Sequence, residues 1–207
     1  MNDVYMSTYQ DLPKEEYSRR LKETRSKMGK NNIDALFVYS DEYRPGNGTY
    51  FTNHKTINIV EECAQVLFIP LQGGPVVFTG SLNTFAAKKY SWIKDVRKVD
   101  DLASHLQQIC EELPSPLKKV GIVGEDILPV TLYHSMREGL RKVKFVNAKE
   151  LVDQQRAVKS EEEVSLMKKA AEIGDNCISA VLKEVEPGKS EMELCGVASM
   201  VLSFPFK

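Results

Sequence analysis

The residues that could most directly carry acid–base or metal chemistry are three histidines: His54, His105 and His134. Imidazole titrates near neutral pH and is a frequent metal ligand, so each histidine is a possible site residue. All three are isolated in the sequence, and His105 lies inside a predicted helix, which favours a structural or solvated role. His54 follows Tyr50 in a loop-like stretch and is therefore the histidine retained as a candidate site residue.

The four cysteines do not point to a redox centre or a nucleophile. Cys63, Cys110, Cys177 and Cys195 show no C-x-x-C spacing and no paired pattern. In an intracellular chain of this size such cysteines are typical of reduced thiols with packing roles. No neighbouring feature selects one of them as a catalytic residue.

Two further motifs are weak as sites. The stretch GIVGED at 121–126 has two glycines after a predicted strand, but it lacks the third glycine of a dinucleotide loop, and Pro129 follows soon after. The acidic run Glu161–Glu163 begins a predicted helix, where it interacts favourably with the helix dipole. It is therefore interpreted as a helix N-terminus and not as an acid–base pair.

The composition is that of an ordinary globular protein, with 42% hydrophobic and 28% charged residues. The net charge of −1 gives no sign of a nucleic-acid or anionic-membrane partner. Apolar runs fall far short of the roughly 20 residues that cross a bilayer. The N-terminal residues lack the apolar core of a signal peptide, so a cytoplasmic location is expected.

Strands and helices alternate along residues 17 to about 150, which predicts an α/β fold. Two short β-rich runs joined by LQGG predict a hairpin, so the sheet should be mixed and not wholly parallel. The stretch 41–54 is loop-like because of its Pro, Gly and Asn content. We expect helices over 13–32, 100–113 and 129–142, and strands over 33–40, 63–70, 75–80, 118–126 and 143–148.

A long helix is predicted to follow this α/β region. Ser160 and Glu163 have the spacing of a capping box, and Pro187-Gly188 stops the helix. A second capping box, Ser190 with Glu193, opens another helix. The long helix carries one apolar face that needs a partner surface, so this segment should associate with another chain or be the most mobile part of this one. That face comprises Val164, Met167, Ala171, Gly174, Ile178, Val181 and Val185.

The segment LVDQQRAVKSEEEVSLMKKAAEIGDNCISAV, followed by EPGKSEMEL, resembles the junction in the creatinase/prolidase (Xaa-Pro aminopeptidase) family. There an Arg, a Lys-Ser pair and a glutamate-led helix open the catalytic "pita-bread" domain. Upstream, NGTYFTN is similar to the family's Asn-x-x-Tyr-x-Thr-Gly segment, with Asn53 in place of the usual Gly. The matching junction residues are Arg156, Lys159, Ser160, Glu163, Met167, Lys168, Ala170, Ala171, Pro187, Gly188, Ser190 and Glu191.

The resemblance implies a three-layer N-terminal domain over 1–150, with helices on both faces of a mixed sheet. Residues 151–207 would be the linker and first helices of an incomplete catalytic domain. Family hydrolases bind two divalent metal ions through two Asp, one His and two Glu beyond the junction. This chain has no histidine after His134, so it lacks that ligand set, and we expect no cofactor, no metal site and no activity from the chain alone.

The resulting functional expectation is the N-terminal, non-catalytic part of a truncated Xaa-Pro peptidase-like metallohydrolase. As the resemblance implies, it would take part in dimerisation and border the active site of a partner subunit, with Tyr50, Asn53 and His54 as the substrate-bordering candidates. Its partner would be a second copy or a missing catalytic domain. The alternatives are a stand-alone dimerisation or peptide-binding module and, less favoured, an unrelated α/β nucleotide-binding protein.

Overall fold

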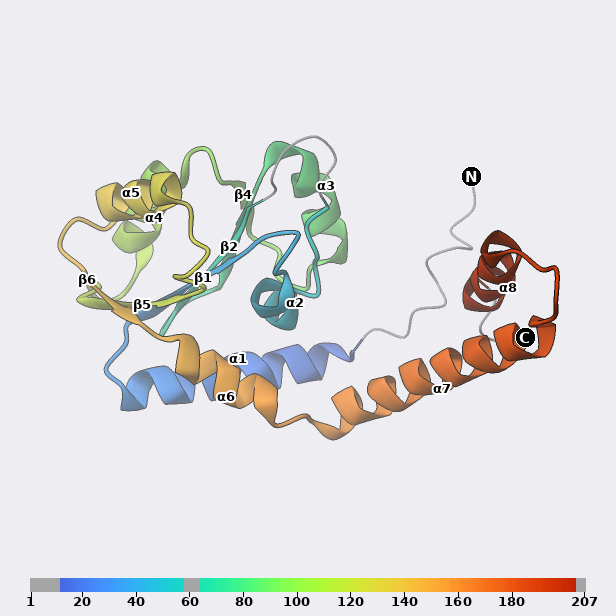
Figure 1. The fold of residues 1–207 in the computed structure, drawn as a ribbon. Coiled ribbons are helices and arrows are strands. Elements are labelled where there is room, and N and C mark those ends of the chain that lie inside the picture. Colours follow the sequence, from blue (N-terminus) through green and yellow to red (C-terminus); the bar gives the residue numbers. More distant parts are fainter. Residues whose placement is uncertain (1–11, 58–63, 204–207) are drawn as a thin grey trace. The chain divides into compact units, whose positions relative to one another are not determined.

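The computed structural model describes residues 12–57 and 64–203. The chain divides into two units, Pro13–Val158 and a second unit that contains residues 159–203. The first is an α/β unit and the second is helical (Figure 1). No helix in the described part of the chain is both long enough and apolar enough to cross a membrane.

The α/β unit alternates strands and helices in the way the sequence predicts. Its elements, in chain order, are α1 (Lys14–Lys30), β1 (Ala35–Ser40), α2 (Gly46–Thr52), β2 (Gln65–Pro70), β3 (Val76–Thr79), α3 (Ser81–Tyr90), β4 (Val96–Lys98), α4 (Leu102–Glu112), β5 (Lys119–Val123), α5 (Val130–Gly139), β6 (Lys144–Asn147) and α6 (Lys149–Ala157).

The strands form one mixed sheet in the order β4-β3-β2-β1-β5-β6. Strand β2 is antiparallel to both of its neighbours, β1 and β3, while the β3–β4, β1–β5 and β5–β6 pairs are parallel. The predicted hairpin is therefore confirmed as β2–β3. Strands β1 and β2 are buried along their whole length, as expected for the centre of a sheet that is covered on both faces.

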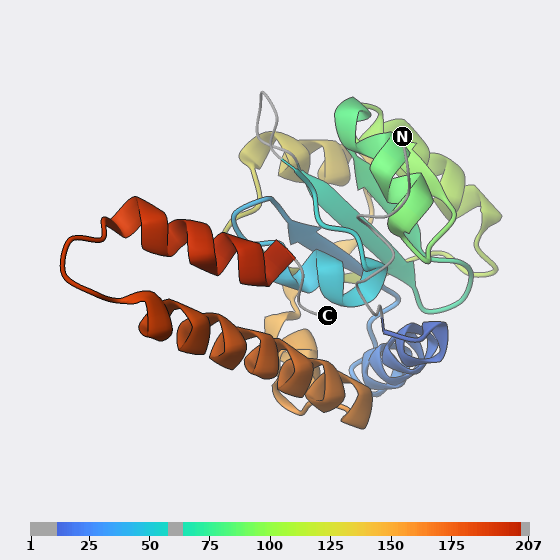
Figure 2. The ribbon, with the colours of Figure 1, turned by 90° about the vertical axis from the view of Figure 1, so that its right-hand side faces the viewer.

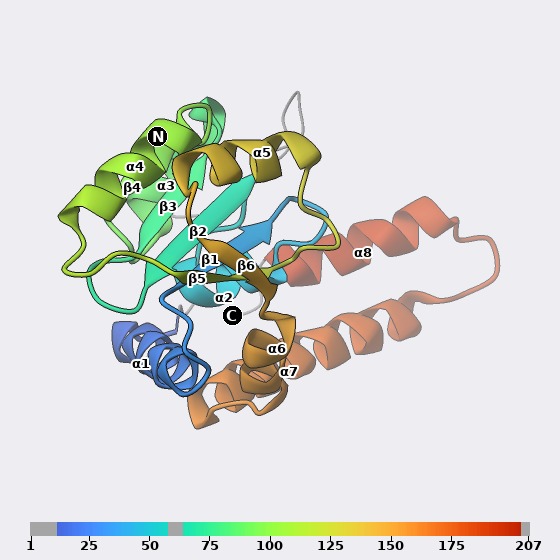
Figure 3. The same cartoon turned by 90° about the vertical axis from the view of Figure 1, so that its left-hand side faces the viewer.

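Helices cover both faces of the sheet, which confirms the expected three-layer α/β fold (Figure 3). On one face, Leu36 and Val38 of β1 pack in a core with residues of α1, α2, α3 and α6. On the other face, Phe37 and Tyr39 pack in a second core with residues of α4 and α5. Alternate residues of one strand thus serve two different cores, as the pleat of a strand requires.

The apolar spacings in the sequence correctly predict which sides of α1 and α4 are buried. In α4, Leu102, Leu106 and Ile109 are all buried against the sheet. In α1, Tyr17, Thr24 and Met28 are buried and share one helical face. In both helices the recurrence at three and four residues marks the side that faces the core.

Three regions differ from the sequence-based expectation. Residues 46–52, interpreted as loop, form helix α2, and residues 81–98 contain α3 and β4, for which no element was predicted. Residues 149–157, interpreted as a connection, form helix α6, which buries Leu151 and Val152 in the first unit. The structure therefore divides after Val158, whereas the predicted boundary fell after residue 150. Cys63 lies outside the described residues.

The second unit is an antiparallel pair of helices, α7 (Glu161–Glu184) and α8 (Glu191–Ser203) (Figure 2). The predicted capping box is present at α7, because Ser160 accepts from the Glu163 amide while Glu163 accepts from the Ser160 amide. The amide of Ser190 donates likewise to the Glu193 carboxylate, at 2.8 Å, ahead of α8. Neither helix contains a buried residue in its described part, in contrast to the first unit.

Candidate functional site

The candidate site is the segment that runs through α2 and into the following loop, from Asn47 to Thr56. Helix α2 ends at Asn53, whose φ of 59° and ψ of 7° are left-handed. Gly is the usual residue at such a helix end, and Asn is among the few others that adopt this conformation readily. Asn53 therefore keeps the turn that Gly would make at the end of the Asn-x-x-Tyr-x-Thr-Gly segment.

Gly48 allows α2 to lie directly on the sheet. A Cβ atom at this position would be 2.1 Å from Ser40 Oγ and 2.9 Å from Gln65 Nε2. Because these are side chains of β1 and β2, any larger residue would push the helix away from the strands. The close contact between the backbone of α2 at Gly48 and the strands thus determines the position of the residues that follow α2.

Thr52 connects the end of α2 to the sheet and to the loop. Its hydroxyl oxygen accepts from Gln65 Nε2 at 2.9 Å and from the backbone N–H of His54 at 3.0 Å. The hydroxyl also lies 2.9 Å from the Gly48 carbonyl, to which it can donate. Since Thr52 and Gln65 are both buried, these bonds hold the chain direction at His54 firmly.

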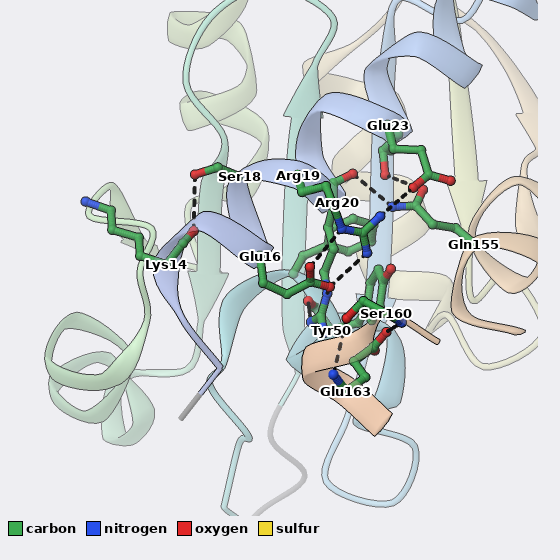
Figure 4. Close-up of polar contacts among 12 residues, drawn as sticks. Lys14, Glu16, Ser18, Arg19, Arg20, Glu23, Tyr50, Gln155, Ser160 and Glu163 are labelled. Atoms are coloured by element: carbon green, nitrogen blue, oxygen red, sulfur yellow. Dashed lines mark hydrogen bonds and ion pairs between the residues drawn. The ribbon is translucent and has the colours of Figure 1, made fainter. Parts of the chain in front are cut away.

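A buried cation holds the other side of α2 (Figure 4). Arg20 of α1 donates from Nη1 to the Tyr50 carbonyl at 2.6 Å and from Nε to Glu16 Oε1 at 3.0 Å. Its guanidinium also lies 4.1 Å from the centre of the Tyr50 ring and 5.1 Å from that of Tyr17. Such stacked, hydrogen-bonded burial is suited to the planar arginine head.

The charge of this cluster is balanced chiefly by Glu16. Hydrogen bonds from Arg19 and Arg20, together with their positive charges, lower the pKa of the Glu16 carboxyl, against the opposing effect of burial. Arg19 binds both oxygens of that carboxylate, at 2.7 and 2.8 Å. The carboxylate is thus held ionised within the domain, where it neutralises the buried Arg20.

Helix α6 binds the same cluster through two consecutive side chains. Gln155 donates to the Arg20 carbonyl at 2.9 Å and accepts from the Thr24 hydroxyl at 2.9 Å. Arg156 donates to Asn47 Oδ1 at 2.6 Å. The segment around α2 is therefore connected to α1, to the sheet and to α6 within one rigid domain.

The three predicted site residues lie together but are presented differently. Tyr50 is 7% exposed and His54 is 3% exposed, so both side chains are within the domain, whereas Asn53 is partly exposed. Burial lowers the pKa of His54, which favours the neutral imidazole. Within the described residues, His54 Nε2 has no hydrogen-bond partner. Of the three predicted residues, Asn53 is thus the one whose side chain is accessible from outside the domain.

Sequence reasoning missed Arg20, Glu16 and Gln155 among the residues that hold this segment, and it selected Arg156 as a motif residue without its contact to Asn47. One signal was present: Arg20 lies three residues after Tyr17 and four before Thr24, so it shares the predicted buried face of α1. An arginine on a buried helical face needs a carboxylate or carbonyl partner, and Glu16 is one turn away. Nothing in the sequence indicates that Gln155, far along the chain, completes the cluster.

The remaining histidines and cysteines do not form a second centre. His105, a partly buried residue of α4, packs against Phe78, with the two ring centres 6.0 Å apart. Burial raises the pKa of the Cys110 thiol, which disfavours the reactive thiolate. Cys177 donates weakly to the Ala198 carbonyl within the helix pair. Across residues 12–57 and 64–203, no three His, Cys, Asp or Glu side chains are grouped closely enough to hold a metal ion.

The donor set therefore does not fit a resident metal pair within the described part of the chain. What the segment offers is a rigidly held polar turn, with the Asn53 amide at its partly exposed end. Such a turn can orient or exclude a ligand. The described chain thus combines a three-layer α/β domain that carries this turn with a capped long helix.

Comparison with known proteins gives the family. Residues 20–158 match the model of the Creatinase/Prolidase N-terminal domain, so the chain belongs to the creatinase/prolidase family. This membership confirms the resemblance seen in the sequence. It also rules out the alternative of an unrelated α/β nucleotide-binding protein.

Individual relatives agree with this assignment. The chain is 23% identical over 177 residues to the "Xaa-Pro dipeptidase" of Pyrococcus horikoshii, covering 81% of this chain and 42% of the relative. It is 26% identical over 201 residues to the "Ectoine hydrolase" of Halomonas elongata, covering 87% and 47%. The X-Pro aminopeptidase structure from Thermotoga maritima has a TM-score of 0.72 at 21% identity, covering 88% and 48%. The chain thus spans about half the length of these relatives.

Proposed function

We propose that this chain acts as the N-terminal portion of an Xaa-Pro peptidase-like hydrolase, with a role in dimerisation and in bordering the active site of a partner subunit. The observation that carries the proposal is the family match over 20–158. Two compared proteins are named for Xaa-Pro substrates, which supports that substrate class over the ectoine named for the Halomonas elongata relative.

The architecture of the α2 segment supports a bordering role. Its turn at Asn53 is held from three sides, by Arg20 of α1, Gln65 of β2 and Arg156 of α6. A residue that limits the space around a substrate must not yield when the substrate binds, and interactions of this kind provide that stiffness. Asn53 would contact or exclude part of the substrate, while the buried Tyr50 and His54 would hold its backbone.

Catalysis itself is assigned elsewhere in this proposal. The described residues offer no cluster of metal ligands, so the purified 207-residue chain should not hydrolyse X-Pro dipeptides or tripeptides in the presence of manganese, cobalt or zinc. The assay should be run in parallel with the Pyrococcus horikoshii dipeptidase as a positive control. Turnover that survives purification and disappears on chelation would overturn the non-catalytic assignment.

The bordering role can be tested in a fusion of residues 1–158 with the catalytic part of that dipeptidase. Replacing Asn53 by Gly, which keeps the left-handed turn but removes the amide, should lower kcat/KM for an X-Pro dipeptide roughly threefold to tenfold, as expected for the loss of one positioned polar contact. Lys55→Ala, two residues away and exposed, is the matched control. Equal activities of the two variants, with unchanged thermal stability, would contradict the proposed role of Asn53.

A further inference from the structure

Three buried side-chain atoms of the α/β unit have no hydrogen-bond partner among the described residues: His54 Nε2, Thr56 Oγ1 and Thr79 Oγ1. The three residues are 3%, 1% and 0% exposed. A buried donor or acceptor without a partner is costly and rare in folded proteins, because such groups normally bind either protein atoms or ordered water. The three atoms therefore need a partner that lies inside the unit.

His54 and Thr56 point into the unit from the segment that follows α2. Along this segment His54 and Thr56 are buried, whereas Lys55 and Ile57 are exposed. An alternation with a period of two is typical of extended chain, in which residues two positions apart project to the same side. The unpartnered atoms of His54 and Thr56 thus belong to side chains on the inner side of one short segment.

Thr79, the last residue of β3, lies on the sheet face beneath this segment. Val77, two residues earlier, is in the core that includes residues of α2 and α3, so Thr79 projects to the same face. Its partner across the sheet is Gln65 of β2. Gln65 Nε2 donates to Thr52 Oγ1 at 2.9 Å, and the same oxygen accepts from the His54 amide at 3.0 Å. One hydrogen-bonded connection therefore leads from the neighbour of Thr79 to His54.

Helix α3 makes a second connection, between Thr79 and Thr56. Asn83 is buried in the first turn of α3, which begins two residues after Thr79. The Asn83 side chain accepts from the Ile57 amide at 2.9 Å and donates to the Ile57 carbonyl at 3.1 Å. Because Ile57 directly follows Thr56, these bonds hold Thr56 near the start of α3. The three unpartnered atoms are thus gathered between the end of β3, the start of α3 and the segment after α2.

The chemistry of the three groups suits a small neutral ligand. Burial lowers the pKa of His54, which favours the neutral imidazole, and threonine hydroxyls are neutral. A hydroxyl both donates and accepts, and Nε2 of a neutral imidazole does one or the other according to its tautomer. The ligand must therefore donate as well as accept, and it must be small enough to enter a closed interior. Water has both properties.

We propose that His54, Thr56 and Thr79 form a binding site for internal water beneath the segment that follows α2. The water bridges Nε2 and the two hydroxyls, and it thereby connects this segment to the end of β3. Internal waters that bind about three otherwise unsatisfied groups are a regular part of folded proteins and are costly to remove. The site lies within the α/β unit and does not depend on the proposed function.

Threonine-to-valine variants test the site, because bound water and the lack of any partner predict effects of opposite sign. Valine has nearly the shape of threonine but no hydroxyl. If Thr79 Oγ1 binds water, Thr79→Val should raise the equilibrium constant for urea unfolding about fivefold to thirtyfold. If that hydroxyl has no partner, the constant should fall, and a fall or no change overturns the proposal. Thr24→Val, which removes a buried hydroxyl bonded to Gln155 at 2.9 Å, is the positive control.

The double variant Thr56→Val, Thr79→Val tests whether the two hydroxyls share the site. The first substitution already weakens the binding of a shared water, so the second should cost less. The unfolding constant of the double variant should then rise at least about twofold less than the product of the two single rises. A rise equal to that product would show that the hydroxyls act independently and would overturn the shared site.

Oxygen-17 relaxation dispersion of the solvent detects the water itself, because internal molecules exchange more slowly than those at the surface. In the 207-residue chain, Thr79→Val should lose the contribution of a long-lived water. Thr79→Ser keeps the hydroxyl and should retain that contribution, as should Thr24→Val. Circular dichroism verifies that each variant is folded. Equal contributions from the parent and from folded Thr79→Val, or a loss in Thr79→Ser as well, would overturn the role of the Thr79 hydroxyl.

Discussion

The two units of this chain are stabilised in different ways. The α/β unit has two apolar cores, one on each face of its sheet, and a buried polar cluster around Arg20. The helical unit buries no residue in its described part and relies on capping and on the contact between two helices. The first unit therefore has apolar cores of its own, whereas the apolar side chains of α7 and α8 are not buried in the described part of the second unit.

The first prediction is that replacing a large apolar side chain by alanine has very different effects on stability in the two units. Phe68→Ala, in the fully buried strand β2, should lower the free energy of unfolding by about 3–5 kcal/mol. Met167→Ala, on the exposed side of α7, should change it by less than about 0.5 kcal/mol. Urea unfolding followed by the fluorescence of Trp92 measures the α/β unit, and far-UV circular dichroism measures the helices of the second unit. Comparable losses would mean that α7 is buried in solution.

The second prediction concerns the buried cation. Arg20→Met should destabilise the α/β unit by about 3 kcal/mol, because Glu16 loses a buried partner and the Tyr50 carbonyl loses its donor. Arg19 is the matched control, since it binds the same carboxylate from a position that is 45% exposed. Arg19→Met should cost about 1 kcal/mol or less in the same denaturation experiment. If the two losses are similar, the buried location of Arg20 does not matter.

The third prediction concerns helix capping in the second unit. Ser160→Ala removes the acceptor of the Glu163 amide and should destabilise the start of α7 by about 1 kcal/mol. Hydrogen exchange should then be faster at residues 161–165 and unchanged in the α/β unit. Ser165→Ala, on the exposed surface of the same helix, is the control and should not accelerate exchange.

The fourth and smallest effect is a pH dependence confined to the α/β unit. Burial lowers the pKa of His54 in the folded state, so the unfolded chain takes up a proton first as the pH falls below about 6.5. Folding stability should therefore decrease from that pH down to the folded-state pKa. His54→Gln should flatten the dependence of the unfolding free energy on pH between 7 and 5.5, measured by urea unfolding at a series of pH values.

The fold could be read from the sequence wherever one periodicity dominates. The spacing in α1 and α4 and the short apolar runs of β1, β2 and β5 correctly located these elements. Helices α2 and α6 were missed because their helical state depends on tertiary contacts. The Gly- and Asn-rich α2 is held by Gln65 and Arg20, and α6 by Thr24 and its own buried leucine and valine.

The candidate site was only partly predictable for a similar reason. Motif resemblance selected Tyr50, Asn53 and His54, and Asn53, in place of the family's usual Gly, adopts a left-handed conformation. A motif does not reveal exposure, however, and the structure shows that two of these side chains are buried. The connection from Gln155 to Thr24 joins residues 131 positions apart, a separation over which local sequence patterns carry no information. Whether the three residues border a substrate stays a prediction.

The junction between the units has a practical consequence. Val158 is 77% exposed, and the backbone is extended both there and at Ser160, with ψ angles of 111° and 168°. Extended, accessible chain is the conformation that proteases bind, and Lys159 is a trypsin cleavage site at this position. Brief digestion should therefore release the α/β unit as a resistant fragment that ends near residue 159. That fragment, free of the exposed helices, would be the form of this protein best suited to crystallisation.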